Sequence, residues 1–360
     1  MRPDAPTLQR MQDRDDAERA KQVEQALTHY PIGDRVGVEH IPMGLIHGTY
    51  RVESATGMYI VQRLHPDLSS DSNLRDYQAV TAHLADQSFP APRLILTGEG
   101  NPSADVRGDR YRLTTFLKGE SYDCVKNTRM VKEAALMLGS FHTAMADFRY
   151  EFQAGRPLHD SPKHLEFLQS ALRQFRNHPM MGEVGPLAEK VSTDLPRHFL
   201  PTPWASRVVH GDPKISNVLF DPATGRAVGL IDLDSCARHT VLVDIGDAVR
   251  SWCREGPEDQ ATPFLADRFR AFCEGYRQSD APLSGAERPL IAPSCRLITL
   301  ELASRFLRDA LEDRYFGWDA ARFASRPAHN LARAKGCLFL YESMAGQREE
   351  MEKVVGEVWG

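Results

Sequence analysis

The residues best suited to chemistry lie in the segment 208–232, where two apolar runs flank a turn rich in Pro and Gly. This pattern predicts a β-hairpin, and a turn centred on 224–225 places Asn217 opposite Asp232. Amide and carboxylate oxygens suit Mg²⁺, which completes its shell with water and nucleotide phosphates. Asp212 lies on the loop that enters the hairpin, where a carboxylate can orient an attacking hydroxyl and accept its proton. The segment therefore indicates phosphoryl transfer, although Asp and Asn at a hairpin mouth can also simply cap turns.

Two differently built regions must position these residues. Alternating apolar patterns predict strands near 36–41, 49–53, 58–64, 93–97 and 110–116, with one helix between the third and the fourth. After residue 127 the periodicity is mostly helical, through 131–145, 163–175, 262–279, 286–315 and 325–350, and a single β-type island interrupts it at 207–233. We therefore predict an α+β protein with a helical extension (1–30), a small antiparallel β lobe (31–116), a connector (117–127) and a larger, mainly helical lobe (128–360).

Composition excludes several other classes of protein. The chain has 360 residues, 26% of them charged and 42% hydrophobic, which is a soluble globular balance. No apolar stretch suffices for a membrane helix, no signal peptide is visible, and a net charge of −5 gives no reason to expect nucleic acid. The six cysteines are scattered without a C-x-x-C spacing, as expected for reduced thiols in a cytoplasmic protein. No obligate protein partner is evident.

The order Asp212, four residues, Asn217 and a later Asp232 resembles the catalytic loop and metal-binding Asp of protein kinases. His-Gly-Asp at 210–212 and Ile-Asp-Leu-Asp at 231–234 are similar to the aminoglycoside phosphotransferase and choline kinase superfamily. Further segments resemble its N-acetylhexosamine 1-kinase group: 210–221, 244–250, 305–309, 313–316 and 330–334. The resemblance spans about 31–345.

This resemblance implies a protein-kinase-like bilobal fold in which Asp212 is the catalytic base and Asn217 and Asp232 bind Mg²⁺. It implies that His210 supports the loop by hydrogen bonding. Asp234 either binds a second metal or caps a turn, and we expect Asp244 and Asp247 to brace the catalytic loop or its arginines.

The resemblance also locates a nucleotide end. Gly44 and Gly48 lie between the first two strands, where backbone N–H groups can approach phosphates. Thr115 and Phe116 end the last strand of the small lobe, where backbone groups of related kinases hold adenine. Related folds place Lys or Arg on the third strand, but this strand has no Lys, and alternation lets only one of Gln62 and Arg63 face the phosphates. We expect Arg63 to bind them as a fork-shaped donor.

The acceptor pocket is expected in the helical lobe, where Arg305 and Tyr315 lie in a stretch of mixed polar and aromatic character. Without the resemblance, this stretch would be taken for an amphipathic helix with a solvated charged face. With it, Arg305 and Tyr315 become candidate sugar contacts. The sequence thus predicts a kinase that transfers the γ-phosphate of ATP to the anomeric hydroxyl of an N-acetylhexosamine. The alternatives are a kinase of another alcohol (an aminoglycoside, choline, homoserine or a different sugar) and a pseudokinase that binds nucleotide or sugar without transfer.

Overall fold

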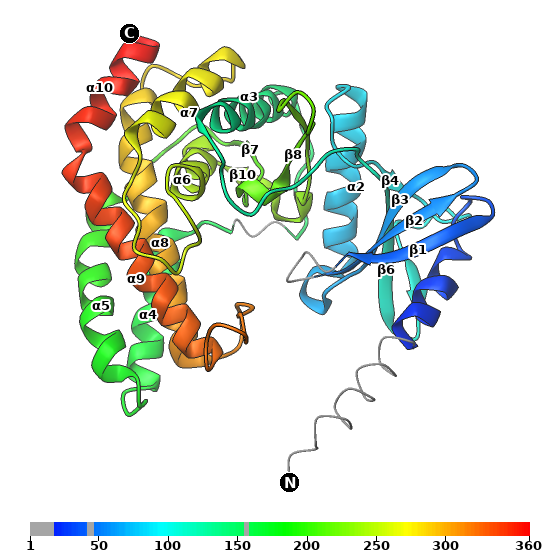
Figure 1. The fold of residues 1–360 in the computed structure, drawn as a ribbon, viewed down its shortest axis with the longest axis horizontal. Helices are drawn as coiled ribbons and strands as arrows, with labels where there is room; N and C mark the ends of the chain where they lie inside the picture. Colours follow the sequence, from blue (N-terminus) through cyan, green and yellow to red (C-terminus); the bar gives the residue numbers. More distant parts are fainter. Residues whose placement is uncertain (1–17, 42–46, 155–157) are drawn as a thin grey trace. The chain divides into compact units, whose positions relative to one another are not determined.

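The computed structural model describes residues 18–41, 47–154 and 158–360 (Figure 1). The chain forms two compact units. Unit 1 contains the chain up to Asp86, then Ala91–Leu117 and Tyr150–Ala154, and unit 2 contains Gln87–Pro90, Lys118–Arg149 and the rest of the chain. A mixed α+β architecture, with the antiparallel sheet in the N-terminal part and mostly helices after it, confirms the predicted fold class.

Unit 1 is an antiparallel sheet in the order β1-β2-β3-β6-β4, with β5 pairing with β6. Its elements are β1 (Arg35–Ile41), β2 (Gly48–Ser54), β3 (Gly57–Arg63), α2 (Asp71–Asp86), β4 (Leu94–Ile95), β5 (Ala104–Val106) and β6 (Asp109–Thr115). One face of the sheet packs against a helix at 18–27 through a buried apolar cluster that includes Val61, Leu113 and Leu27. The other face carries α2, whose Tyr77 lies beneath the guanidinium of Arg112 on β6.

The expected strand at 93–97 is shorter in the structure. Only Leu94–Ile95 pairs with β6, because the Thr97 N–H turns back to the carbonyl of Asn101 at 2.9 Å. Strand β5, which the sequence analysis missed, forms a short hairpin with β6 instead. Of the expected N-terminal helical extension, 18–27 is helical, and residues before 18 lie outside the described residues, as does Gly44.

Unit 2 is mainly helical. Its helices are α3 (Thr128–Ala144), α4 (Ser161–Gln174), α5 (Met181–Asp194), α6 (Val241–Trp252), α7 (Ala266–Gln278), α8 (Ile291–Glu312), α9 (Arg326–Gly346) and α10 (Arg348–Trp359). Most side chains of α8 are buried, because α4, α6 and α9 pack around it. Two short ladders complete the unit: β7 (Arg207–Val209) with β10 (Ala237–His239), and β8 (Val218–Phe220) with β9 (Ala227–Leu230).

Several helices of unit 2 differ from the expectation. Helix α5 was not predicted, because Gly182, Gly185 and Pro186 obscure its period, yet it buries Val184 and Val191. The segment expected as one helix over 325–350 is two, α9 and α10, separated at Gln347. Within the described residues, none of the helices combines the length and the apolar character needed to span a bilayer.

Candidate active site

The loop over 210–217, called the catalytic loop below, leaves β7, passes through a single turn of 3₁₀ helix at Ile215–Asn217 and enters β8. The predicted register of the hairpin is wrong by one residue. Val218 pairs with Leu230, and the Asn217 carbonyl accepts a hydrogen bond from the Ile231 N–H at 2.9 Å. A bulge places one extra residue, Val228, in β9 opposite Leu219 and Phe220, and Asn217 is still not the strand partner of Asp232. The turn nevertheless brings the Asn217 Nδ2 to 3.4 Å from the Asp232 Oδ2.

Four polar side chains meet at this hairpin mouth. The Lys214 Nζ lies 2.6 Å from the Asp212 Oδ2 and 3.7 Å from the Asp232 Oδ2, so that one ammonium bridges two carboxylates. The Asn217 Nδ2 donates to the Asp212 carbonyl at 2.8 Å. The structure therefore brings together Asp212, Asn217 and Asp232, as the sequence analysis expected, and adds Lys214.

Lys214 is the site residue that the sequence analysis missed. A lysine two residues after Asp212 in a polar loop looks like an ordinary solvated charge. Its position in the sequence could have revealed it. Lys214 lies between Asp212 and Asn217, two residues that were both expected in the site, so a side chain between them was bound to lie near it. Its side chain keeps 41% of its surface exposed, so the ammonium can also meet a ligand.

The electrostatics of the cluster differ between its two carboxylates. Burial raises the pKa of Asp212, but the charge and hydrogen bond of Lys214 outweigh burial and bring the pKa below its ordinary value. Burial raises the pKa of Asp232, Lys214 offsets this only in part, and the neighbouring Asp212 and Asp234 charges keep the pKa raised. Burial lowers the pKa of Lys214, yet the two carboxylates raise it above its ordinary value. Asp212 is thus an ionised acceptor, whereas Asp232 lies in an excess of negative charge that a cation would relieve.

The donor set fits a hard divalent cation. Because the Asn217 Nδ2 is used as a donor to the Asp212 carbonyl, the amide oxygen is left to act as a ligand. Together with the Asp232 carboxylate it offers the oxygen donors that Mg²⁺ takes from proteins, usually one or two beside phosphates and water. A cation bound there would offset the burial and the neighbouring carboxylate charges that raise the pKa of Asp232.

A buried carboxylate holds the loop in place. Asp244, near the start of α6, is fully buried and accepts hydrogen bonds from the His210 N–H at 2.6 Å and the Gly211 N–H at 2.9 Å. Its third donor is the His142 Nε2 at 2.9 Å. Burial raises the pKa of Asp244, but these donors outweigh it and lower the pKa below its ordinary value. Asp244 therefore braces the catalytic loop, as predicted, and Asp247 pairs with Arg250 at 2.7 Å.

The backbone of the loop also restricts its own sequence. Gly211 has φ +85°, and a Cβ on it would lie 2.4 Å from the Ser235 carbonyl oxygen, so that only glycine fits. His210 supports the loop, as expected: its Nδ1 accepts from the Asp212 N–H at 3.3 Å, and its Nε2 donates to the Ile231 carbonyl at 2.9 Å.

In unit 1, residues that were expected to bind the nucleotide already interact with other residues of the protein. Arg63 forms an ion pair with Asp109, with its Nε 2.9 Å from the Oδ2. The Thr115 N–H donates to the Arg93 carbonyl at 2.9 Å, and the Phe116 N–H to the Met58 carbonyl at 3.1 Å. The backbone donors expected to hold adenine are thus used inside unit 1, which leaves carbonyl oxygens and the Phe116 ring for that task.

Gly48 begins β2 opposite Arg63. A Cβ at this position would meet the Arg63 Cβ at 3.6 Å, an ordinary contact. Packing alone therefore does not require glycine there.

Both expected acceptor residues lie near one aromatic ring. The Arg305 guanidinium lies 5.5 Å from the centre of the Phe316 ring, and the Tyr315 ring packs edge-on against the same ring at 4.9 Å. Asp309 fixes this segment, because its carboxylate accepts from the N–H groups of Tyr315 and Phe316 at 2.8 and 2.9 Å. Tyr315 is 61% exposed, as a ligand-contacting ring can be.

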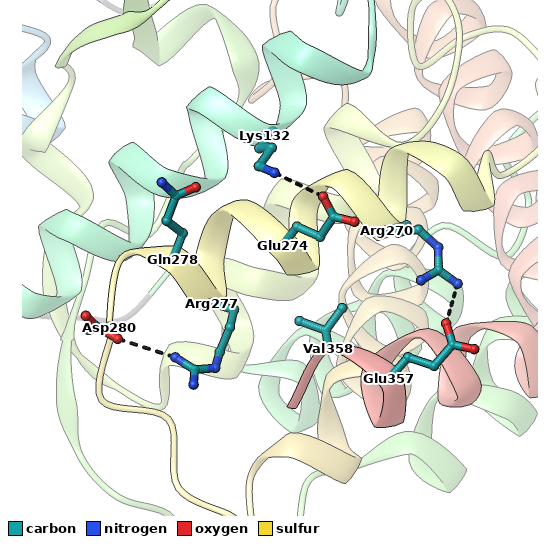
Figure 2. A pocket seen from close by; sticks show the side chains of 8 residues that line it. All are labelled: Lys132, Arg270, Glu274, Arg277, Gln278, Asp280, Glu357 and Val358. Atoms are coloured by element: carbon teal, nitrogen blue, oxygen red, sulfur yellow. Dashed lines mark hydrogen bonds and ion pairs between the residues drawn. The ribbon is translucent and has the colours of Figure 1, made fainter. Parts of the chain in front are cut away.

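A pocket on unit 2 lies among other residues, between α3, α7 and α10 (Figure 2). Its charges are paired with one another: Lys132 with Glu274 at 3.1 Å, and Arg270 with Glu357 at 2.6 Å. No residue of the catalytic loop lines it. We assign the chemistry to the hairpin mouth, not to this pocket.

Comparison with known proteins gives relatives along most of the chain. A homoserine kinase of Methylobacillus flagellatus is 24% identical over 303 residues, which cover 82% of this chain and 86% of that protein. A homoserine kinase of Zymomonas mobilis is 26% identical over 265 residues, which cover 72% of this chain and 78% of that protein.

Solved structures share the fold at lower identity. An amicoumacin kinase in complex with AMP-PNP, Ca²⁺ and its ligand superposes with a TM-score of 0.60 at 15% identity, covering 89% of this chain and 90% of that one. A microcompartment-associated aminopropanol kinase gives 0.60 at 17% identity, covering 91% and 98%. The choline kinase LicA of Streptococcus pneumoniae gives 0.54 at 15% identity, covering 87% and 94%. The protein-kinase-like fold expected from the sequence is thereby confirmed.

The sequence pattern of one family spans both units, from the first strand of the sheet to the segment after α7, and includes the whole catalytic loop. Because residues 37–282 match that pattern, this chain belongs to the phosphotransferase enzyme family known as APH.

Proposed function

We propose that this protein transfers the γ-phosphoryl group of ATP to the anomeric hydroxyl of an N-acetylhexosamine, such as N-acetylglucosamine or N-acetylgalactosamine. The observation that carries phosphoryl transfer is the cluster at the hairpin mouth, in which the Lys214 ammonium bridges the Asp212 and Asp232 carboxylates. Membership of a phosphotransferase family supports the same reaction class. The sugar itself rests on the resemblance of the segments around Arg305 and Tyr315 to N-acetylhexosamine 1-kinases.

Each residue of the cluster has a different role in the proposed reaction. Asp212, which Lys214 keeps ionised, accepts the proton of the acceptor hydroxyl as its oxygen forms a bond to the γ-phosphorus and the bond to the β-phosphate oxygen breaks. The Asn217 amide oxygen and the Asp232 carboxylate would hold Mg²⁺, which when bound neutralises phosphate charge. The exposed part of Lys214 places a further positive charge beside the same reacting atoms.

The nucleotide is assigned to unit 1. Gly44, Gly48 and one side chain of the third strand, Arg63 or Gln62, are its proposed phosphate contacts, and Thr115 and Phe116 its proposed base contacts. The ion pair of Arg63 with Asp109 must be exchanged for phosphate if Arg63 is to serve.

The acceptor is assigned to Arg305 and Tyr315. Within the described residues, Arg305 has no hydrogen-bonded carboxylate, so its donors are left for hydroxyl or N-acetyl oxygens of a sugar. The exposed Tyr315 ring offers an apolar face of the kind that packs against a sugar ring.

Homoserine is the second candidate acceptor, because the relatives described above are named homoserine kinases. An amino acid needs a cation for its carboxylate and an accessible anion for its ammonium. Arg305 suits the first need. Glu301, one turn earlier on α8, is fully buried and already accepts hydrogen bonds from the His159 Nδ1 at 2.8 Å and the Ser161 Oγ at 2.5 Å. This engagement of Glu301 favours a neutral sugar over a zwitterion.

A phosphorus NMR time course with Mg-ATP tests the proposal. Separate tubes receive N-acetylglucosamine, N-acetylgalactosamine, glucose, homoserine, choline or an aminoglycoside. We expect a phosphomonoester signal coupled to the anomeric proton of an N-acetylhexosamine. A product with homoserine alone would replace the sugar by the amino acid. Stable ATP in every tube, with nucleotide still bound, would support a binding module without transfer.

The Asp212→Asn variant is the matched control for that assay. It keeps the shape of the side chain but removes the proton acceptor. We expect it to abolish product formation while Mg-ATP still binds, and normal turnover would refute the role of Asp212 as the base.

A further inference from the structure

Residues of strand β3 alternate between the two faces of the sheet in unit 1. Val61 and Arg63 share the face that the helix at 18–27 covers, and Val61 belongs to the buried apolar cluster there. Arg63 forms an ion pair with Asp109 on that same face of the sheet. Because the apolar cluster fills this face, a nucleotide cannot lie against it. Gln62 points to the opposite face, which carries α2.

The strand partner of Gln62 is a buried cation. Gln62 and Arg112 are directly opposite in the antiparallel pairing of β3 and β6, and the Arg112 Nη2 donates to the Gln62 Oε1 at 2.7 Å. The Arg112 side chain is 2% exposed, and its guanidinium lies 3.7 Å from the centre of the Tyr77 ring on α2. Stacking on Tyr77 and bonding to Gln62 hold this guanidinium in one place.

This contact fixes the direction of the Gln62 amide. A guanidinium carries only donors, so the amide atom that faces Arg112 must be the oxygen. The amide nitrogen, with two N–H donors, therefore points away from Arg112. Gln62 is partly exposed, and no hydrogen-bond acceptor occupies its amide nitrogen among residues 18–41, 47–154 and 158–360.

We propose that the Gln62 Nε2 is the third-strand donor to the nucleotide phosphates, and that Arg112 is the residue that positions it. This inference rests on the proposed function, which supplies the nucleotide. It replaces Arg63, the residue that the sequence analysis favoured, with its neighbour on the opposite face.

The same pair explains the missing lysine. An ammonium at position 62 would stand directly across the strand from the Arg112 guanidinium, and like charges in that position destabilise a sheet. Glutamine avoids this repulsion, because its oxygen accepts from Arg112 while its nitrogen serves the ligand. The third strand thus presents a neutral donor that a buried arginine orients.

The test is Gln62→Glu, which exchanges the outward N–H₂ for an oxygen and keeps the acceptor that faces Arg112. Because Arg112 gains an ionised partner, we expect the variant to unfold at or above the temperature of the wild type. Isothermal titration should show Mg-ATP binding weakened about tenfold to a hundredfold, the range of a hydrogen bond to a charged group turned into repulsion. Binding of adenosine, which has no phosphate, should be unchanged.

Gln153→Glu is the matched control. Gln153 is also in unit 1, and its Oε1 accepts from an arginine, the Arg75 Nε, at 2.8 Å, but at an exposed position. This variant should bind Mg-ATP and adenosine as the wild type does. Gln62→Met removes the donor without adding charge and should weaken Mg-ATP about tenfold. Arg112→Met lets the amide turn either way and should weaken Mg-ATP at least about twofold, again without effect on adenosine.

The outcomes separate this inference from the proposed function. If the wild type does not bind Mg-ATP, the proposed function fails and the inference with it. If the wild type binds and both Gln62 variants bind equally well, the inference alone is overturned. Equal losses for Mg-ATP and adenosine would also overturn it, because such losses report a distorted unit, not a lost phosphate contact.

Discussion

Replacing Asp244 by Asn tests whether this carboxylate positions the catalytic loop in addition to stabilising the protein. The Asp244 carboxylate is fully buried and accepts from the His210 N–H, the Gly211 N–H and the His142 Nε2. An asparagine keeps one acceptor oxygen and turns an N–H₂ group toward a donor. Since the Oδ2 accepts two of these hydrogen bonds and the Oδ1 one, one or two charge-assisted hydrogen bonds are then lost, each contributing about 1.5–3 kcal/mol, so the free energy of unfolding should fall by about 1.5–6 kcal/mol.

Turnover should fall as well, because two of the three donors are backbone groups of residues 210 and 211, directly before Asp212. A shift of about 1 Å in a reacting group costs about a hundredfold in rate. We therefore expect kcat of Asp244→Asn to fall by about that factor, measured by product formation at a temperature where the variant is folded.

Asp76→Asn provides the matched control. Asp76, on α2 in unit 1, is also buried and accepts three hydrogen bonds, from the Tyr150 hydroxyl at 2.9 Å, the Gln153 N–H at 2.8 Å and the Ala154 N–H at 2.9 Å. It should lose comparable stability in a urea titration and keep a kcat close to that of the wild type. If both variants lose kcat equally, or if Asp244→Asn keeps it, the assignment of Asp244 as the brace of the loop is refuted.

Three further changes test other parts of the site. Lys214→Met should lower kcat about a hundredfold to a thousandfold, as expected when one charge-stabilising donor is removed, and an unchanged kcat would count against the cluster. Gly211→Ala should lower both kcat and the unfolding temperature, because its Cβ would meet a carbonyl oxygen at 2.4 Å, whereas Gly225→Ala, with φ +68° but no atom within 4 Å, should lose only about 1–2 kcal/mol of stability to backbone strain and keep its kcat. Burial raises the pKa of Glu301, but His159 lowers it to about 2 from 4.5, so its stabilisation is present above pH 4.5 and is lost as the pH falls toward 2. That loss amounts to about 3 kcal/mol, and Glu301→Gln should flatten urea midpoints measured across this acid range; an equally steep dependence would refute the pairing.

Local pattern was enough to predict most elements of the fold. The alternation in 49–53 and 58–64 predicted β2 and β3 within one residue at each end, because those strands have one face in the apolar cluster. The meeting of Asp212, Asn217 and Asp232 at the hairpin mouth could be predicted because a hairpin in this segment brings these three positions together, and their spacing resembles that of the kinase catalytic loop. Helix α5 was not predicted because its stability comes from burying Val184 and Val191 in the core. This burial outweighs the poor helix propensity of Pro186 and the neighbouring glycines.

What the sequence did not reveal depends on contacts between distant residues. A turn and a one-residue bulge together set the hairpin register, and a bulge has no signature in the alternation around it. Gln62 and Arg112 are paired only because β6 lies beside β3, although β4 and β5 come between them in the chain. The choice between Gln62 and Arg63 could therefore not be made before the faces of the sheet were known.

The distribution of charge differs between the two units. In unit 2, burial and the neighbouring Asp212 and Asp234 charges raise the pKa of Asp232, and Lys214 is the cation that bridges Asp212 and Asp232. In unit 1, the third strand presents the neutral amide of Gln62 in place of a lysine. If the strand contributes no charge, the negative charge of the transferring phosphoryl group must be balanced by Lys214 and by the cation that Asn217 and Asp232 would hold. Under the proposed function, a third strand without lysine is thus compatible with catalysis, because the positive charge that the reaction needs would be concentrated on the catalytic loop.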